Sequence, residues 1–242
     1  MRERVIFCWS GGKDSSLALY KILHDERYEV VALLTTCNEH FQRVSMHGVR
    51  IGLARRQAAE IGLPLDVMYL SENPSNDEYE AKMAQYLTRK QAEGISAVVF
   101  GDIFLEDLRK WREANLAKVG LRGIFPLWRQ DTKVLIREFL DAGFGSIICC
   151  VSDAHFGESD VGKPIDQSFI EALPRNVDPC GENGEFHSFA FKGPVFAAPI
   201  PFALGAKVYR PIRSSENANS ARPPAGEHRS PRGFWFCDLL EA

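Results

Sequence analysis

The chain has 242 residues, of which 45% are hydrophobic and 25% are charged, and its formal net charge is −3. This composition is typical of a globular protein with one large domain or two small ones. Proteins that bind nucleic acids usually carry an excess of positive charge, which this chain lacks. No apolar run approaches the roughly 18 residues needed to span a bilayer. We therefore expect neither nucleic acid nor a membrane as a partner.

The six cysteines form no C-x-x-C pair and no zinc-binding spacing. Most of them lie in or beside apolar runs, where a free thiol behaves as a small hydrophobe. The chain begins with charged residues that lead directly into an apolar run, without a signal-peptide core. Together these features predict a reduced, cytoplasmic protein.

Strands and helices alternate in the first half of the chain. Continuous apolar runs predict buried parallel strands over residues 5–9, 30–35, 65–70, 97–100 and 124–127. Helical spacing of apolar residues predicts helices over 50–62 and 75–94. The alternation indicates right-handed βαβ units, and so an α/β protein with a doubly wound, mainly parallel five-stranded sheet.

The pattern changes after Trp128. A helix over 132–142 and a strand over 146–151 are followed by a stretch rich in Gly, Pro and Asp, with short strands at 186–191, 207–210 and 234–238. We predict a first domain over 1–128 and a smaller α+β domain over 129–242 that packs over the strand ends. Residues 214–232 lack an apolar period, which predicts a mobile surface insertion.

The run SGGKDS at residues 10–15 follows the first predicted strand and opens a helix. Backbone N–H groups at a helix N-terminus suit an anion, usually a phosphate. The run does not fit the dinucleotide fingerprint G-x-G-x-x-G or the Walker loop G-x-x-x-x-G-K-[ST]. An aspartate inside a phosphate cradle indicates a Mg²⁺ beside it.

This run resembles the pyrophosphate loop of the PP-loop ATP pyrophosphatases, or adenine nucleotide alpha-hydrolases. The resemblance implies a HUP/Rossmann-like ATP-binding domain, ATP and Mg²⁺ as cofactors, and cleavage of ATP between the α and β phosphates. Residues 101–115, 125–128 and 180–189 are further similar to the diphthine–ammonia ligase family. In that family the carboxyl of diphthine, a modified histidine on elongation factor 2, is amidated with ATP and ammonia.

The resemblance and the chemistry together assign roles within the loop. The N–H groups of Gly11 and Gly12 and the hydroxyls of Ser10 and Ser15 are expected to hold the β and γ phosphates. Lys13 is expected to neutralise charge on the α–β bridge as pyrophosphate leaves; the alternative is a solvated lysine at a helix start. Asp14 is expected to bind Mg²⁺, or else to act only as a helix cap.

Other residues are placed near the nucleotide by the family pattern. Thr35, at the end of the second strand, is expected beside the adenine. His47 is expected near the phosphates, although an exposed histidine at a helix start is an equal alternative. Gly101 and Asp102 end the fourth strand at the expected switch point, and Asp102 is assigned a catalytic role.

Arg109 and Arg112 are spaced to share one helix face, and we expect them to hold an anionic acceptor or a phosphate. The alternative is a solvated basic face. Glu182 and Glu185 are expected to orient the acceptor or ammonia, unless their loop is simply a surface turn.

Phe186, His187 and Ser188 stand where ligases acting on diphthine carry tyrosine, glutamate and threonine, which predicts an altered acceptor pocket. His187 is assigned to substrate binding, with an outward-facing bystander as the alternative. Cys180 leaves a sulfur-transfer role open.

The sequence and its resemblance thus predict an ATP-dependent ligase that adenylates a carboxylate and transfers it to ammonia. The resemblance implies that this carboxylate is on a protein like elongation factor 2. Two alternatives stay open: a PP-loop enzyme that modifies tRNA or nucleotides, including by thiolation, and a non-catalytic ATP-binding protein. The oligomeric state is also open, a homodimer included.

Overall fold

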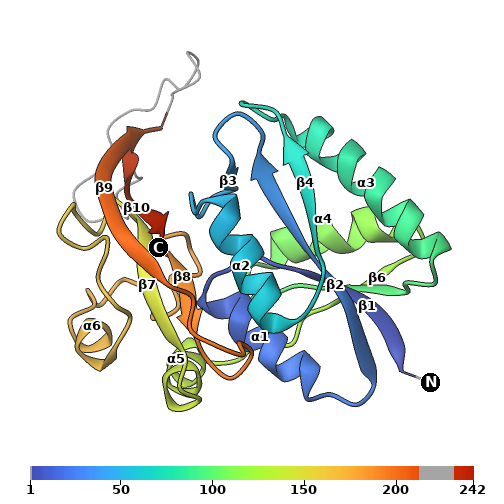
Figure 1. Cartoon of the computed structure of the whole chain (residues 1–242), viewed down its shortest axis with the longest axis horizontal. Helices are drawn as coiled ribbons and strands as arrows, with labels where there is room; N and C mark the ends of the chain where they lie inside the picture. Colours follow the sequence, from blue (N-terminus) through green and yellow to red (C-terminus); the bar gives the residue numbers. More distant parts are fainter. Residues whose placement is uncertain (1, 213–231) are drawn as a thin grey trace.

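The computed structural model of the chain describes residues 2–212 and 232–242 and contains two β-sheets (Figure 1). The strands are β1 (Glu3–Cys8), β2 (Tyr28–Asn38), β3 (Arg43–Val44), β4 (Leu65–Leu70), β5 (Ala97–Val99), β6 (Arg122–Ile124), β7 (Gly145–Ser152), β8 (Phe186–Lys192), β9 (Phe202–Pro211) and β10 (Gly233–Glu241). The helices are α1 (Lys13–Leu23), α2 (Ile51–Ile61), α3 (Asn76–Ala92), α4 (Glu106–Ala117), α5 (Thr132–Asp141) and α6 (Gln167–Glu171).

The first sheet is mainly parallel, as predicted. Strands β4, β2, β1, β5 and β6 lie side by side in that order, and β3 adds a short antiparallel pair to the end of β2. Four of the five predicted parallel strands lie where they were expected. The strand predicted over 124–127 was misplaced: β6 spans Arg122–Ile124 and shares only Ile124 with the prediction. Residues 126–129 form a turn instead, and Pro126 has no N–H to donate to a strand ladder. β3 was not predicted, because a two-residue strand is too short to show a periodic pattern.

The order of the strands places a ligand site at one edge of this sheet. The chain runs from β1 through β2 to β4 on one side, then crosses to β5 on the other side of β1. Ligands bind at such a switch point, outside the carboxyl ends of the strands. Here the two strand ends lead into residues 10–15 and 100–102, the segments that the sequence singled out.

The second sheet is antiparallel, with the order β8-β7-β10-β9. The last strand of the chain, β10, therefore lies inside this sheet and not at its edge. The predicted strands are all present but longer than predicted, and the short helix α6 was not predicted. Most of the predicted insertion, residues 214–231, lies outside the described residues.

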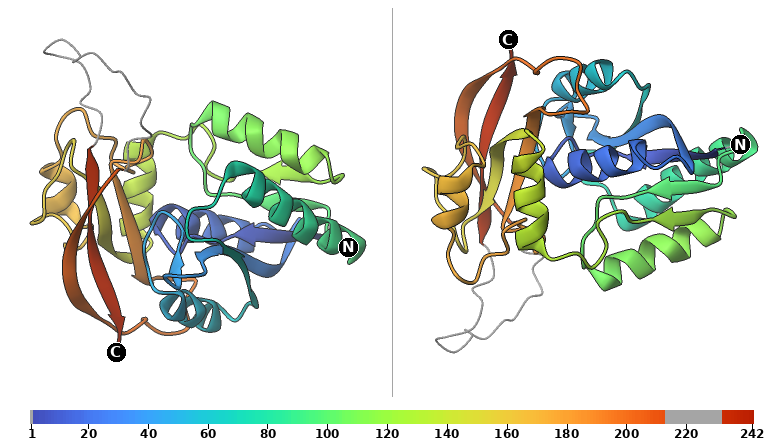
Figure 2. Two further views of the ribbon diagram at one scale, coloured as in Figure 1. Left: turned by 90° about the horizontal axis from the view of Figure 1, so that it is seen from above. Right: turned by 90° about the horizontal axis from the view of Figure 1, so that it is seen from below.

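The two sheets share one hydrophobic core. Helices α1 and α2 lie between them (Figures 1 and 2), and the main cluster of buried side chains draws on both halves of the chain, including Leu17 and Leu53 from one and Ile148 and Phe189 from the other. A separate cluster lies under α3 and α4 on the opposite face of the first sheet. The predicted domain boundary after residue 128 falls between β6 and α5 and stays a prediction.

Across the described parts of the chain, none of the helices combines the length and apolar character needed to cross a membrane. All six cysteines are free thiols. The fold therefore depends on packing and hydrogen bonds and not on disulfide bridges.

Candidate active site

Residues 10–12 form a tight turn between β1 and α1, and residues 13–15 begin α1. Gly11 has a φ of +78°, a left-handed conformation that glycine adopts at little cost. The Ser10 hydroxyl accepts a hydrogen bond from the Gly12 N–H at 3.3 Å and lies 3.1 Å from the Ser15 hydroxyl. The loop thus brings two hydroxyls and the N-terminus of α1 together, as predicted for a phosphate-binding turn.

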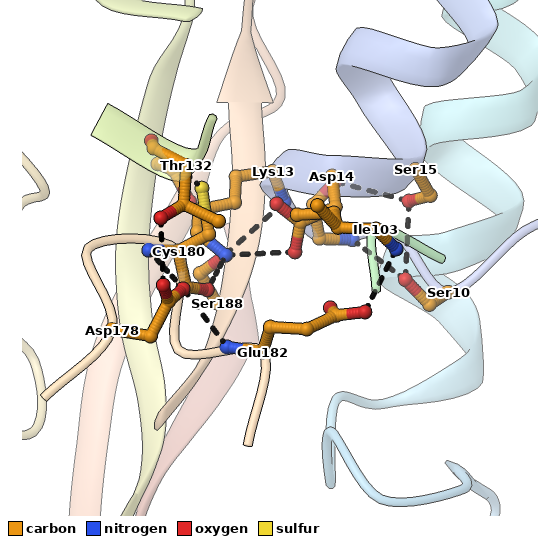
Figure 3. A network of polar contacts seen from close by, with 12 residues as sticks. Ser10, Lys13, Asp14, Ser15, Ile103, Thr132, Asp178, Cys180, Glu182 and Ser188 are labelled. Carbon is orange, nitrogen blue, oxygen red and sulfur yellow. Dashed lines mark hydrogen bonds and ion pairs between the residues drawn. The ribbon is translucent and has the colours of Figure 1, made fainter. Parts of the chain in front are cut away.

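The first turn of α1 is capped from the second sheet. Gly12 stands at the N-cap position and has no side chain with which to cap the helix. Instead, the Ser188 hydroxyl of β8 accepts a hydrogen bond from the Lys13 N–H at 3.1 Å (Figure 3). Next to it, the Ala190 N–H donates to the Gly11 carbonyl at 2.8 Å. Strand β8 therefore supports the loop directly.

Gln57 of α2 is a buried support of the loop that sequence reasoning missed. Its side chain is fully buried and its amide donates to the carbonyls of Gly11, at 2.9 Å, and Ala190, at 2.7 Å. Its side-chain oxygen accepts the indole N–H of Trp9 at 3.0 Å. The sequence could have indicated this role, because Gln57 lies on the apolar face of a predicted helix and a buried amide needs several hydrogen-bond partners.

Lys13 connects the loop to the second half of the chain. Its ammonium lies 2.7 Å from the Asp14 carboxylate and donates to the Cys180 carbonyl (Figure 3). The ammonium also lies over the Phe186 ring. Burial alone would lower the pKa of Lys13, but Asp14, Cys180 and Glu182 together outweigh burial, and the pKa is raised. Lys13 is therefore a buried, charged group and not a solvated lysine.

Glu182 reaches from the acidic loop, residues 178–185, to the switch point. Its carboxylate accepts the N–H groups of Ile103 at 2.8 Å and Phe104 at 3.3 Å, just after β5 (Figure 3). Burial raises the pKa of Glu182 to about 7, although these two N–H groups oppose the shift. The side chain can thus gain or lose a proton near neutral pH.

Glu185 is turned into the acidic loop. The side chain is 4% exposed, and one oxygen accepts the Asp178 N–H and the Asn183 side-chain amide, both at 3.0 Å. Its other oxygen has no hydrogen-bond partner among the described residues. Glu185 thus braces the loop and keeps one buried oxygen for a further donor.

Asp178 was also missed by sequence reasoning. Its carboxylate accepts the Thr132 hydroxyl at 2.7 Å and the Cys180 N–H at 2.8 Å, which ties the acidic loop to α5 (Figure 3). An aspartate before a proline looks like an ordinary turn residue, so nothing in the local pattern indicated this contact.

His47 and His187 meet beside the phosphate loop. Their rings are 4.9 Å apart, and His47 Nδ1 lies 3.0 Å from the Ser188 carbonyl oxygen. Burial lowers the pKa of His47 to about 4 and that of His187 to about 3, so both imidazoles are neutral at pH 7. His187 therefore faces His47 and the loop and is not an outward-facing bystander.

Thr35 lies near the carboxyl end of β2. The residue is 2% exposed, and its hydroxyl has no hydrogen-bond partner among the described residues. A buried polar group without a partner is costly unless something else satisfies it. The position predicted for the adenine thus has an unused hydroxyl.

Gly101 and Asp102 follow β5 at the switch point. A Cβ atom on Gly101 would lie 3.2 Å from the Ser15 Cα, so a glycine lets this strand end approach α1 closely. Asp102 is paired at 2.7 Å with Arg112, whose guanidinium stacks over the Phe100 ring. The carboxylate therefore has a structural partner in addition to any catalytic role.

The two predicted anion-binding arginines are engaged separately. Arg109 pairs with Glu113 at 2.8 Å and stacks over the rings of Phe125 and Trp128. Arg112 also lines a cavity of about 250 Å³ between α3 and α4. Each arginine thus already has a carboxylate partner and an aromatic ring, and their role in holding an anion stays a prediction.

Cys180 is 2% exposed, and its thiol contacts the Thr132 carbonyl oxygen at 3.4 Å. Burial raises the pKa of this thiol well above its ordinary value. A sulfur-transfer cysteine needs an accessible, thiolate-forming side chain, and Cys180 has neither property here.

For a metal ion, the described residues contain no group of three or more His, Cys, Asp or Glu side chains that could hold it. Asp14 offers one partly exposed carboxylate at the loop, with a side-chain exposure of 30%. Mg²⁺ commonly uses one or two protein carboxylates together with phosphate oxygens and water. The residues present fit that mode of binding and not a cage made by the protein alone.

A phosphate loop at the switch point of a parallel sheet, closed by a second sheet that contributes ionisable groups, defines a nucleotide-binding α/β enzyme. Comparison with known proteins identifies the family within this class of enzymes. Residues 3–123 match the family model of the diphthamide synthase N-terminal domain, and residues 131–211 match that of the C-terminal domain.

Curated relatives agree with the family models. The diphthine–ammonia ligase of Mus musculus is 26% identical over 222 residues, which cover 81% of this chain and 82% of the mouse protein. The human diphthine–ammonia ligase is 25% identical with the same coverage. That of Schizosaccharomyces pombe is 26% identical over 141 residues, covering 56% of this chain and 23% of the yeast protein. The chain belongs to the diphthamide synthase family and is an ATP-dependent ligase of the diphthine–ammonia ligase kind.

Proposed function

We propose that the protein activates a carboxylate with ATP, releases AMP and pyrophosphate, and transfers the acyl group to ammonia. The acceptor that we propose is diphthine on a protein like elongation factor 2, as the names of the relatives suggest. Formation of an acyl-adenylate converts an unreactive carboxylate into an electrophile with AMP as its leaving group. The protein's main contribution is then to position the reactants and to neutralise charge.

The observation that carries this proposal is the position of Lys13. Its ammonium is shared between the phosphate loop, through Asp14, and the acidic loop, through the Cys180 carbonyl. One buried cation therefore joins the segment suited to ATP phosphates and the segment suited to the acceptor. This arrangement supports a single site in which ATP cleavage and acyl transfer occur side by side.

On the nucleotide side, the N–H groups at the start of α1 and the hydroxyls of Ser10 and Ser15 would hold the terminal phosphates, and Lys13 would balance the charge of the departing pyrophosphate. The unused Thr35 hydroxyl would face the adenosine. Asp14 would hold Mg²⁺, which when bound adds positive charge beside the phosphates.

On the acceptor side, Glu182 would accept a proton from the attacking nitrogen. Its pKa of about 7 suits a base that works near neutral pH. The free oxygen of Glu185 would accept an N–H from ammonia.

The three residues at 186–188 that differ from ligases acting on diphthine do not bear equally on the choice of acceptor. Phe186 is 1% exposed and Ser188 caps α1, so both side chains serve the interior. His187 is the one of the three that is only half-buried, and it faces His47. Any difference in acceptor is therefore expected at His187.

Product analysis tests the proposal. The protein is incubated with ATP, MgCl₂ and ammonium chloride, with and without elongation factor 2 carrying diphthine, and the nucleotides and the acceptor's mass are measured. AMP, pyrophosphate and a carboxyl-to-amide mass change that depend on the acceptor are expected. ADP and phosphate would overturn the cleavage mode. Intact bound ATP in every mixture would favour a non-catalytic ATP-binding protein.

A further inference from the structure

The loop that carries His47, residues 43–50, is held in an unusual conformation. Arg43 and Arg50 form an antiparallel bridge at its base, and the Val44 N–H donates to the Val49 carbonyl at 2.8 Å. Met46 has a φ of +63°, although its side chain is 71% exposed and packs against little. A non-glycine residue in the left-handed region persists only where its surroundings hold it there.

One carboxylate of the C-terminal strand closes both ends of this loop. Asp238 of β10 accepts Arg43 Nη1 at 2.8 Å and Arg50 Nη2 at 2.7 Å, with a second contact to Arg50 Nε at 3.2 Å. Arg43 also donates to the Gly48 carbonyl at 2.8 Å. The Asp238 side chain is 19% exposed, whereas Arg43 and Arg50 are 32% and 43% exposed, so these charge-assisted hydrogen bonds have a mostly buried acceptor and partly exposed donors.

The rest of β10 packs against the same region. A Cβ atom on Gly48 would lie 2.9 Å from the Phe236 ring, and Gly52, in the first turn of α2, lies against the Glu241 carboxylate. Strand β10 follows residue 211, where the match to the family model ends. One side of this contact, β10, therefore lies outside both matched segments, whereas the other side, residues 43–52, lies inside the N-terminal match.

At its tip the loop presses His47 onto the phosphate loop. A Cβ atom on Gly12 would lie 2.7 Å from His47 Cε1, so the imidazole fills the space above the Gly12 backbone. His47 Nδ1 lies 3.0 Å from the carbonyl oxygen of Ser188, the residue whose hydroxyl caps α1. A displacement of the base of the His47 loop would therefore move His47 relative to the backbone N–H groups at the start of α1, which we propose bind the phosphates.

We infer that Asp238 is a positioning residue for nucleotide binding: by clamping Arg43 and Arg50, it holds His47 against the phosphate loop. The C-terminal strand thereby completes a site that its own side chains do not contact. This inference rests on the proposed binding of ATP at residues 10–15.

The test compares Asp238→Asn with the wild type in direct ATP binding by calorimetry and in steady-state kinetics. We expect the dissociation constant for ATP to rise about tenfold, with kcat at saturating ATP changing less than about threefold. His47→Ala should cause a similar loss. The double variant should lose no more than either single one, because both changes remove the same contact.

Asp160→Asn is the matched control, since Asp160 also pairs with a basic residue, Lys163 at 2.7 Å, but lies away from the His47 loop. Thermal unfolding shows whether each variant is folded. If Asp238→Asn does not fold, Arg50→Lys tests the same clamp, because it keeps the charge and removes the paired geometry.

ATP binding that is unchanged in a folded Asp238→Asn variant would overturn the inference, as would losses that multiply in the double variant. Failure of the wild type itself to bind ATP would instead refute the nucleotide site. The two failures are therefore distinguishable.

Discussion

The Ser188 hydroxyl accepts a hydrogen bond from the Lys13 N–H at 3.1 Å, although 175 positions separate the two residues. The first turn of a helix leaves N–H groups without partners, and a side chain close in sequence usually caps them. Here the cap comes from β8. Because the glycines of the phosphate loop cannot supply it, a second part of the chain must be docked before the loop is complete.

Replacing Ser188 by Ala should therefore weaken both the fold and the nucleotide site. We expect a loss of about 1 kcal/mol in the free energy of unfolding, the usual value of a helix cap, and a weaker affinity for ATP. Ser188→Thr should retain both properties. Urea unfolding and calorimetric ATP titration measure the two effects.

Ser75→Ala is the control, because Ser75 caps α3 by accepting the Glu78 N–H at 3.1 Å, away from the loop. It should cost a similar free energy of unfolding and leave ATP affinity unchanged. Equal ATP affinity in Ser188→Ala and Ser75→Ala would contradict a role of Ser188 at the phosphate loop.

Gln57→Leu should destabilise the protein by about 2 kcal/mol, since it leaves the buried indole N–H of Trp9 without its acceptor. Gly11 would keep the hydrogen bond from Ala190, so the loop should weaken without unfolding completely. Guanidinium unfolding measures the change. Gln91→Leu, on the exposed side of α3, should shift stability by less than about 0.5 kcal/mol.

Glu182 should give the reaction a pH dependence near neutrality. Its pKa is about 7 in the folded protein against an ordinary value of 4.5. A base must be ionised, so the rate should rise as pH increases through about 7, and Glu182→Gln should lose this limb together with most of the activity. A pH–rate profile at saturating ATP and ammonia measures it.

The raised pKa of Glu182 also makes the stability of the fold depend on pH. Between pH 4.5 and 7 the unfolded chain releases the Glu182 proton while the folded protein keeps it, so the stability that this group contributes is present below 4.5 and lost as pH rises through 7. Glu182→Gln should flatten this part of the stability profile. If the free energy of unfolding of the wild type instead rose between pH 4.5 and 7, and Glu182→Gln removed that rise, the raised pKa of Glu182 would be contradicted.

Lys13→Met should reduce kcat by about 100-fold or more, because it removes a buried cation that joins the two loops. Lys21→Met is a matched control on the same helix, where the ammonium pairs with Glu138 at 2.8 Å instead. It should keep nearly full activity. Release of AMP and pyrophosphate by the Lys13 variant at the wild-type rate would exclude Lys13 from the chemistry.

Local patterns in the sequence determined much of this protein. The apolar runs predicted four of the five parallel strands in place, and the fifth, β6, lies at lower residue numbers than predicted. The run at residues 10–15 predicted a turn between a strand and a helix, and together with residues 101–115, 125–128 and 180–189 it predicted the family. These features depend on backbone sterics and on hydrophobic periodicity, which act over a few neighbouring residues. The two-residue β3 and the short α6 were too brief to produce such a pattern.

Only the tertiary structure decided which side chains support the site. Gln57 contacts Ala190 across 133 positions, and Asp238 contacts Arg50 across 188. In isolation each looks like an ordinary polar residue of a helix or strand. A buried hydrogen bond is set by which surfaces pack together, because the free energy comes from excluding water around both partners at once. The sequence by itself therefore determined the family and the position of the loop between a strand and a helix, whereas packing determined the residues that hold the loop in place.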